Sequence, residues 1–256
     1  MRNFRSRQLG DALSASGRPL PGSDARPQPD QREGGSSKRW PGHSAIAIVG
    51  LLLAASLASG CFYNSQGALL QPPAHDPVAP GVYRVRFKTT RGPIVLEVHR
   101  GWAPQGADRF YYLARHGYYN GAAFFRVVPG FVVQWGLGPD PKVNLAWDKA
   151  NIKDDPVAQS NVRGMATYAK GGPDSRTTQV YINLRDNSRL DALGFAPFGR
   201  VVEGMQLVDR LYGGYGDGPP RGHGPSQARL QKEGAPYLKK DFPKLDRILT
   251  TQVSQR

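Results

Sequence analysis

Residues 124–136 read FFRVVPGFVVQWG. A Pro-Gly pair, a combination that tight turns prefer, interrupts two runs of aliphatic and aromatic residues. The stretch therefore predicts two short strands, or one bent strand, that meet at the Pro-Gly turn. Because strand side chains alternate between two faces, Val132 and Gln134 share a face, and the turn carries Arg126 towards the same surface. This surface combines a permanently charged donor, an amide and apolar walls, with Phe131 beside the turn.

Further short runs with strand-like composition follow from residue 82 onwards. They span residues 82–87, 93–98, 165–169, 178–184, 196–202 and 242–253. Two helices are expected, at 103–117, where apolar residues recur at helical spacing after a proline, and at 202–211. Many short strands and few helices predict a mainly β protein. We expect a closed antiparallel β-barrel of about eight strands capped by two α-helices, since closure removes exposed strand edges.

The segments between these elements differ in character. A long polar loop is expected at 138–161. Residues 212–240 are first Gly/Pro-rich and then polar, so we expect an insertion here. The insertion has room for a short helix at 227–233. Residues 242–253 return to alternation, and we expect them to close the barrel against the first strand.

The N-terminal part of the chain differs from the expected domain at 82–256. Residues 1–44 are rich in Arg, Pro, Gly and Ser without apolar periodicity, which predicts a disordered extension or a misassigned start codon. The apolar run AIAIVGLLLAASLA at 45–58 follows Lys38 and Arg39. It is shorter than the roughly 20 residues of a membrane-spanning helix, and residues 45–60 are typical of a secretory signal peptide. A buried core helix is the alternative, but the flanking sequences offer it nothing to pack against.

Cys61 is the only cysteine and directly follows small residues at the end of this run. The arrangement resembles the lipobox of bacterial lipoproteins, although the family's leucine position holds Ala58 and Leu57 lies one place earlier. We expect lipidation at Cys61 and an exported protein anchored to a membrane in the cell envelope or periplasm. An ordinary signal peptide with an incidental thiol is the alternative. Residues 61–81, with several Pro, Gly and Ser, are expected to form a flexible tether.

Composition excludes several function classes. The formal net charge is +14, but the basic residues are scattered, with no Lys/Arg block, so we expect no nucleic-acid partner. The 5 histidines show no metal-ligand spacing, and the only cysteine lies outside the expected domain. No phosphate-binding loop of the Gly-Lys-Ser/Thr type occurs. We therefore expect no metal and no cofactor.

Several segments, taken in order, resemble the cyclophilin family of prolyl isomerases. The family signature has an aromatic residue, one further residue, Arg, two aliphatics, Pro-Gly-Phe, two aliphatics and Gln. It is present as FFRVVPGFVVQ at 124–134. Further matches are RGMATYA at 163–169, TQVYI at 178–182, Leu190-Asp191 and FGRVV at 198–202. The resemblance covers about residues 82–212 and implies a cyclophilin-like barrel.

The resemblance implies peptidyl-prolyl cis-trans isomerase activity on proline-containing polypeptides by a monomer. It assigns catalysis to Arg126 and Gln134. It assigns substrate binding to Phe131, Val132, Ala169, Gln179, Tyr181, Leu190 and Phe195. A non-catalytic module that binds proline peptides, or a chaperone, is the alternative.

Four positions depart from the family pattern. Lys170 stands where Asn is usual, and Arg189 stands where some members carry Trp. Tyr181 replaces a pocket Phe, and Phe195 replaces a pocket His. None of these changes removes Arg126.

Overall fold

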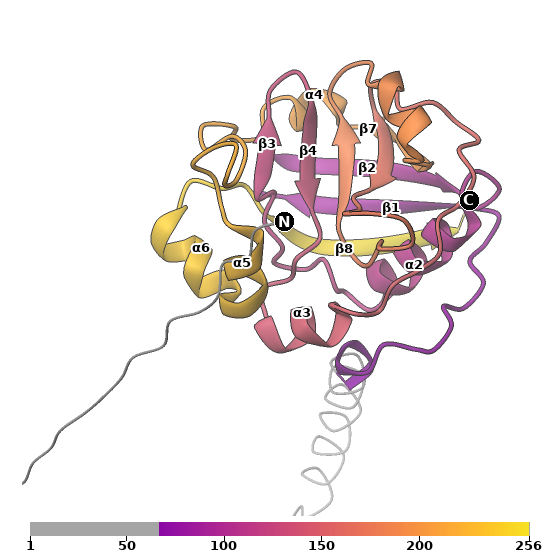
Figure 1. The fold of residues 1–256 in the computed structure, drawn as a ribbon, viewed down its shortest axis with the longest axis horizontal. Helices are drawn as coiled ribbons and strands as arrows, with labels where there is room; N and C mark the ends of the chain where they lie inside the picture. Colours follow the sequence, from indigo (N-terminus) through magenta and orange to yellow (C-terminus); the bar gives the residue numbers. More distant parts are fainter. Residues whose placement is uncertain (1–66, 256) are drawn as a thin grey trace, which may run out of the picture. The chain divides into compact units, whose positions relative to one another are not determined.

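The structure is a computed structural model that describes residues 67–255. Its eight strands form one antiparallel sheet in the order β3-β4-β6-β5-β7-β2-β1-β8. The strands are β1 (Val82–Thr89), β2 (Gly92–His99), β3 (Arg126–Val128), β4 (Val132–Trp135), β5 (Met165–Tyr168), β6 (Val180–Asn183), β7 (Pro197–Glu203) and β8 (Ile248–Gln255). In Figure 1, β1, β2 and β8 run horizontally, whereas β3, β4 and β7 run vertically. The predicted mainly β fold is confirmed.

The expected closed barrel is wrong, because the sheet keeps two edges. β8 pairs with β1 from Tyr83 opposite Gln255 onwards, as predicted. At the far end, however, β3 pairs only with β4. The chain before β3 meets the start of β8 at one isolated bridge, Ala123 to Arg247. Since β3 has only 3 residues, no ladder forms between the two edges.

The helices only partly match the expectation of two. The first is α2 (Pro104–Arg115), and it begins at a proline as predicted. The second is only α4 (Met205–Val208), because the residues before it, up to Glu203, pair with β2 as part of β7.

The remaining helical segments are α3 (Pro141–Trp147), α5 (Gln227–Glu233), α6 (Ala235–Asp241) and the 3-10 helix η1 (Ser188–Leu193). α3 interrupts the polar loop expected at 138–161, and its start has a local cause. The Asp140 side chain accepts a hydrogen bond from the backbone of Lys142, while Pro141 occupies the first turn. Among residues 67–255, no helix has the length and apolar character needed to span a membrane.

The described part of the expected tether, residues 67–81, contacts the domain. The indole of Trp147 donates to the carbonyl of Leu69 at 2.8 Å. Arg109 of α2 pairs with Asp76 at 2.8 Å, and both side chains are nearly fully buried. Such long-range partners leave no local pattern in a Pro-rich sequence. The predicted extension at 1–44, the signal peptide at 45–60 and Cys61 lie outside the described residues.

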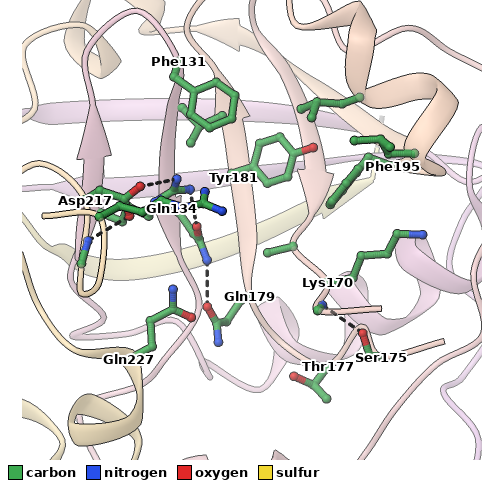
Figure 2. A pocket seen from close by; sticks show the side chains of 18 of the residues that line it. Phe131, Gln134, Lys170, Ser175, Thr177, Gln179, Tyr181, Phe195, Asp217 and Gln227 are labelled. Atoms are coloured by element: carbon green, nitrogen blue, oxygen red, sulfur yellow. Dashed lines mark hydrogen bonds and ion pairs between the residues drawn. The ribbon is translucent and has the colours of Figure 1, made fainter. Parts of the chain in front are cut away.

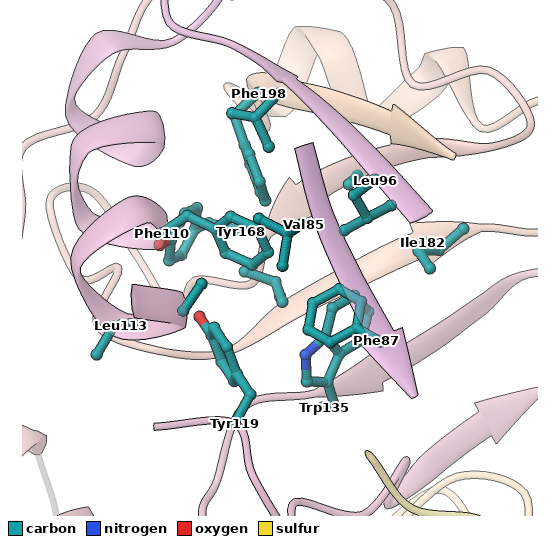
Figure 3. Packing of buried hydrophobic residues seen from close by; sticks show 14 of the residues in the cluster. Val85, Phe87, Leu96, Phe110, Leu113, Tyr119, Trp135, Tyr168, Ile182 and Phe198 are labelled. Carbon is teal, nitrogen blue, oxygen red and sulfur yellow. The ribbon is translucent and has the colours of Figure 1, made fainter. Parts of the chain in front are cut away.

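The main core lies between α2 and one face of the sheet, where aromatic residues meet (Figure 3). Phe110 of α2 contacts Phe198 of β7, with ring centroids 4.8 Å apart, and Tyr119 at 5.4 Å. Trp135 of β4 is almost fully buried beside Phe87 of β1, at 5.9 Å. Burying several aromatic rings of this size supplies much of the driving force for folding. Because Trp135 points into this core, its neighbour Gln134 points to the opposite face of β4, where the site described below lies.

A smaller second cluster joins α5 and α6 to the chain around β3. Its buried members are Ala123, Phe125, Leu137, Leu230, Tyr237, Leu238 and Leu245. The insertion expected at 212–240 is therefore docked beside β3 rather than projecting from the fold, as the position of α5 and α6 in Figure 1 shows.

Deletion of residues 242–256 is expected to abolish cooperative thermal unfolding. The deletion uncovers the edge of β1 and removes Leu245 and Ile248, which are 6% and 0% exposed. Circular dichroism during heating measures this, with Thr250→Ala, exposed on the same strand, as the control. A truncated protein with an unchanged melting temperature would contradict the expectation.

Candidate active site

The Pro-Gly turn sets the register of the strands that carry the polar site residues. Gly130 has φ +68°, the left-handed value that a type II turn needs at its third position, and Phe131 donates its backbone N–H to Val128 at 2.9 Å. With this turn, Arg126 lies opposite Gln134 across β3 and β4. Gln134 in turn lies opposite Tyr181 of β6. The three side chains therefore form one row across the sheet, as the sequence predicted for Arg126 and Gln134.

A hydrogen-bonded chain links the polar members of the site (Figure 2). Arg126 Nη1 donates to Gln134 Oε1 at 3.0 Å, and Gln134 Nε2 donates to Gln179 Oε1 at 2.9 Å. Because arginine has donors only, Gln134 must present its oxygen to Arg126 and its amide hydrogens to Gln179. The Gln179 oxygen thus accepts from Gln134, and its amide nitrogen is left as a donor for a ligand.

Gly136 explains why Gln179 lies within reach of Gln134. It has φ +117°, and a Cβ at this position would collide with the backbone of Thr178. Only glycine lets the end of β4 approach the segment before β6 so closely. The Thr178 hydroxyl also donates to the Gly136 carbonyl at 2.7 Å. This contact fixes the backbone next to Gln179.

The apolar wall of the site combines strand and loop residues. Phe131 comes from the β3–β4 turn, Val132 from the start of β4 and Tyr181 from β6. Leu190 lies in η1, and Phe195 follows it. The rings of Tyr181 and Phe195 meet edge to face with centroids 6.2 Å apart. Figure 2 shows the labelled aromatic rings on the same side of the groove.

A fully buried asparagine, Asn161, holds this wall together. Its Oδ1 accepts from the Tyr181 hydroxyl at 3.2 Å, and its Nδ2 donates to Asp191 Oδ1 and to the Phe195 carbonyl, both at 2.7 Å. Burial alone would raise the pKa of Asp191, but hydrogen bonds from Ser160 and Asn161 hold this pKa below its usual range. Buried polar groups that are all partnered specify one geometry, so Asn161 keeps Tyr181 and Phe195 in place. No sequence pattern pointed to this role.

The polar chain and the apolar wall line one groove of about 660 Å³. It contains every residue that the sequence predicted for catalysis or substrate binding: Arg126, Phe131, Val132, Gln134, Ala169, Gln179, Tyr181, Leu190 and Phe195. The predicted lipidation residue, Cys61, lies outside the described residues. Ala169 contributes through its backbone, which donates to the Gln179 carbonyl at 3.0 Å.

The groove also has lining residues that the sequence prediction missed. On the Gln179 side these are Lys170, Gly171, Ser175, Thr177 and Leu193. The insertion contributes Asp217, Gly218, Pro219, Pro220 and Arg221 on the Arg126 side, and Gln227 near Gln179. Nothing in the sequence around 217 indicates a contact with Arg126, because the two residues are 91 positions apart.

The comparisons with known proteins show the family of the chain. The model of the cyclophilin-type peptidyl-prolyl cis-trans isomerase family matches residues 84–235. The chain belongs to this family. A peptidyl-prolyl cis-trans isomerase of Acinetobacter baylyi is 36% identical over 133 residues, which cover 50% of this chain and 70% of that protein. Peptidyl-prolyl cis-trans isomerase B of Escherichia coli is 34% identical over 138 residues, covering 50% of this chain and 84% of that protein.

A solved cyclophilin-type isomerase of Cryptosporidium parvum aligns with 18% identity and a TM-score of 0.49, over 68% of this chain and 99% of that chain. The family match makes the present chain a cyclophilin-type isomerase, with the groove around Arg126 as its candidate active site.

Two of the residues by which this cyclophilin departs from the family pattern, Lys170 and Arg189, interact with neighbouring side chains. Lys170 pairs with Asp154 at 2.7 Å, and its Nζ lies 5.4 Å from the centroid of the Phe195 ring. The Arg189 guanidinium lies 5.1 Å from the centroid of Phe131, and that of Arg126 lies 5.5 Å from it. Cations at these distances are attracted to an aromatic face. Both changes thus add positive charge at the aromatic walls without blocking the groove.

The rate of catalysis is expected to vary less than about threefold between about pH 5 and pH 8. An arginine side chain does not lose its proton in this range. The Arg126 guanidinium holds the pKa of the Asp217 carboxyl below its usual range, so Asp217 stays ionised. Burial raises the pKa of the Tyr181 hydroxyl, so Tyr181 stays neutral. Neither a histidine nor a cysteine lines the groove among residues 67–255. A bell-shaped profile of kcat/KM within this window would contradict this expectation.

Proposed function

We propose that Arg126 accelerates the isomerisation of X-Pro bonds by donating a hydrogen bond to the proline nitrogen, in polypeptides that fold outside the cell membrane. The observation that carries the proposal is the guanidinium at the edge of an apolar groove with donors to spare. Asp217 and Gln134 use three of its five N–H groups, so two remain for a substrate.

The chemistry of the amide explains why an arginine suits this task. Resonance gives the peptide C–N bond a rotation barrier of roughly 18–20 kcal/mol. When the bond twists, the nitrogen recovers its lone pair and becomes a hydrogen-bond acceptor. A donor aimed at it stabilises the twisted state and not the planar ones, which is the condition for catalysis. A charged hydrogen bond of about 1.5–3 kcal/mol corresponds to roughly ten- to a hundredfold in rate.

The remaining acceleration comes from holding the substrate. The proline ring would sit against the wall of Phe131, Tyr181 and Phe195, while the residue before proline rotates. The free amide nitrogen of Gln179 would donate to a carbonyl of the bound peptide. Such positioning lowers the entropic part of the barrier.

A non-catalytic module that holds proline peptides is the competing function. It would use the same apolar wall, but it would have no need of a guanidinium with unused donors. The order of Arg126, Gln134 and Gln179 along one hydrogen-bonded chain therefore favours catalysis.

Arg126→Ala is expected to lower kcat/KM by roughly ten- to a hundredfold, because the charged donor is lost. A protease-coupled assay on an X-Pro peptide measures the rate. Arg86→Ala is the matched control, since Arg86 also lies on a strand and pairs with an acid, Glu203, but is exposed. Equal rates for wild type and Arg126→Ala would refute the mechanism, and only equal rates at the uncatalysed level would favour the binding module.

The exported location is part of the same proposal. Its support is the signal-like run at 45–60, followed at once by the single Cys61. Lipidation there would place the isomerase at a membrane of a bacterial envelope, next to secreted or envelope proteins as clients. The slow isomerisation of X-Pro bonds, over tens to hundreds of seconds, limits the folding of such clients.

Cys61→Ala is expected to release the protein from the membrane fraction of the producing bacterium, because no thiol remains for a lipid chain. Fractionation followed by immunodetection measures this. Ser65→Ala, a few residues further on, is the control and should stay with the membranes. Membrane retention of Cys61→Ala would contradict the lipid anchor while leaving the isomerase function untouched.

A further inference from the structure

Asp217 lies beside the Arg126 guanidinium although 91 positions separate the two residues. Its carboxylate accepts from Arg126 Nε at 2.7 Å and from Nη2 at 3.0 Å. The side chains of Arg126 and Asp217 are 15% and 23% exposed, so solvent only partly screens the pair. Two parallel charge-assisted hydrogen bonds of this kind fix the plane of the guanidinium as well as its position.

The loop that carries Asp217 is itself braced. Tyr215 packs on the apolar cluster that also holds α5 and α6. The Asp217 carbonyl accepts from the Gly224 backbone at 2.8 Å, which closes the loop on itself. Beyond the loop, the Ser226 backbone donates to the Tyr237 hydroxyl at 3.0 Å. Asp217 thus stands on a segment held on both sides, which is the condition for it to orient another side chain.

The loop forms a wall of the groove and does not fill it. Asp217 and residues 218–221 line the groove, which still has a volume of about 660 Å³. Asp217 occupies Nε and one hydrogen of Nη2, and Gln134 occupies one hydrogen of Nη1. The two remaining hydrogens belong to Nη1 and Nη2, the outer end of the guanidinium. Asp217 therefore holds the guanidinium from its Nε side, and one hydrogen on each of Nη1 and Nη2 is left for the substrate.

We propose that Asp217 is a positioning residue for Arg126, and that the insertion at 212–240 completes the active site by supplying it. An arginine side chain has many rotamers, and each productive encounter would otherwise have to select one of them. Asp217 and Gln134 together restrict this choice before the substrate arrives. The inference rests on the catalytic role proposed for Arg126 above.

Asp217 also has an effect on the rate that opposes positioning. The direction in which the rate changes when Asp217 is removed therefore tests the inference. A carboxylate next to the guanidinium reduces the positive potential that a substrate meets. If this screening dominated, removal of Asp217 would raise the rate. If positioning dominates, as we propose, removal lowers it.

The test measures kcat and KM of the full-length protein with the protease-coupled assay. Asp217→Ala is expected to lower kcat about three- to tenfold with little change in KM, which corresponds to loss of order in one long side chain. Asp217→Asn keeps an acceptor for Nε and should recover part of the loss. Asp209→Ala, which removes the exposed partner of Arg163, is the matched control and should leave the rate unchanged.

A second comparison separates positioning from a merely structural role. In the Arg126→Ala background, Asp217→Ala should cause no further loss, because Asp217 acts through Arg126. The inference is overturned if Asp217→Ala leaves kcat unchanged or raises it, or if it causes the same loss without Arg126. Melting curves of each variant identify any that fail to fold, in which case Asp217→Asn decides. An unaltered rate for Arg126→Ala alone would instead refute the role of Arg126.

Discussion

The register between β3, β4 and β6 is the constraint on which the site depends. It places Arg126 opposite Gln134 and Gln134 opposite Tyr181, so that a polar row runs across three strands. A shift by one residue would turn every one of these side chains to the opposite face. The Pro-Gly turn prevents such a shift on one side, and the close approach of Gly136 to Thr178 prevents it on the other.

One face of β4 packs in the core, and the opposite face carries polar residues of the site. On one face, Trp135 packs with Phe87 and closes the aromatic core. On the other face, Gln134 accepts a hydrogen bond from Arg126 and donates one to Gln179. Because close-packed interiors resist displacement, the core face holds the polar face in place. The fully buried Asn161 gives the same rigidity to the apolar wall, through its hydrogen bonds with Tyr181, Asp191 and Phe195.

The insertion at 212–240 contacts the arginine at the groove edge in two ways. The second apolar cluster ties α5 and α6 to Phe125, the residue immediately before Arg126. The same segment returns Asp217 to the guanidinium. The insertion therefore contacts Arg126 through its neighbour and through its side chain. The insertion expected from its Gly/Pro-rich composition is in this way part of the groove.

The sequence by itself determined the strands and α2, because those signals are local. Alternation, a Pro-Gly turn and a proline at a helix start act within a few residues of one another. The groove residues were named by the resemblance to a family pattern. Tertiary structure alone decided the open edge between β3 and β8, the packing of residues 67–81 and the pairing of Asp217 with Arg126. These depend on where distant parts of the chain meet. A single carboxylate carries no mark of the guanidinium that it will reach 91 positions away.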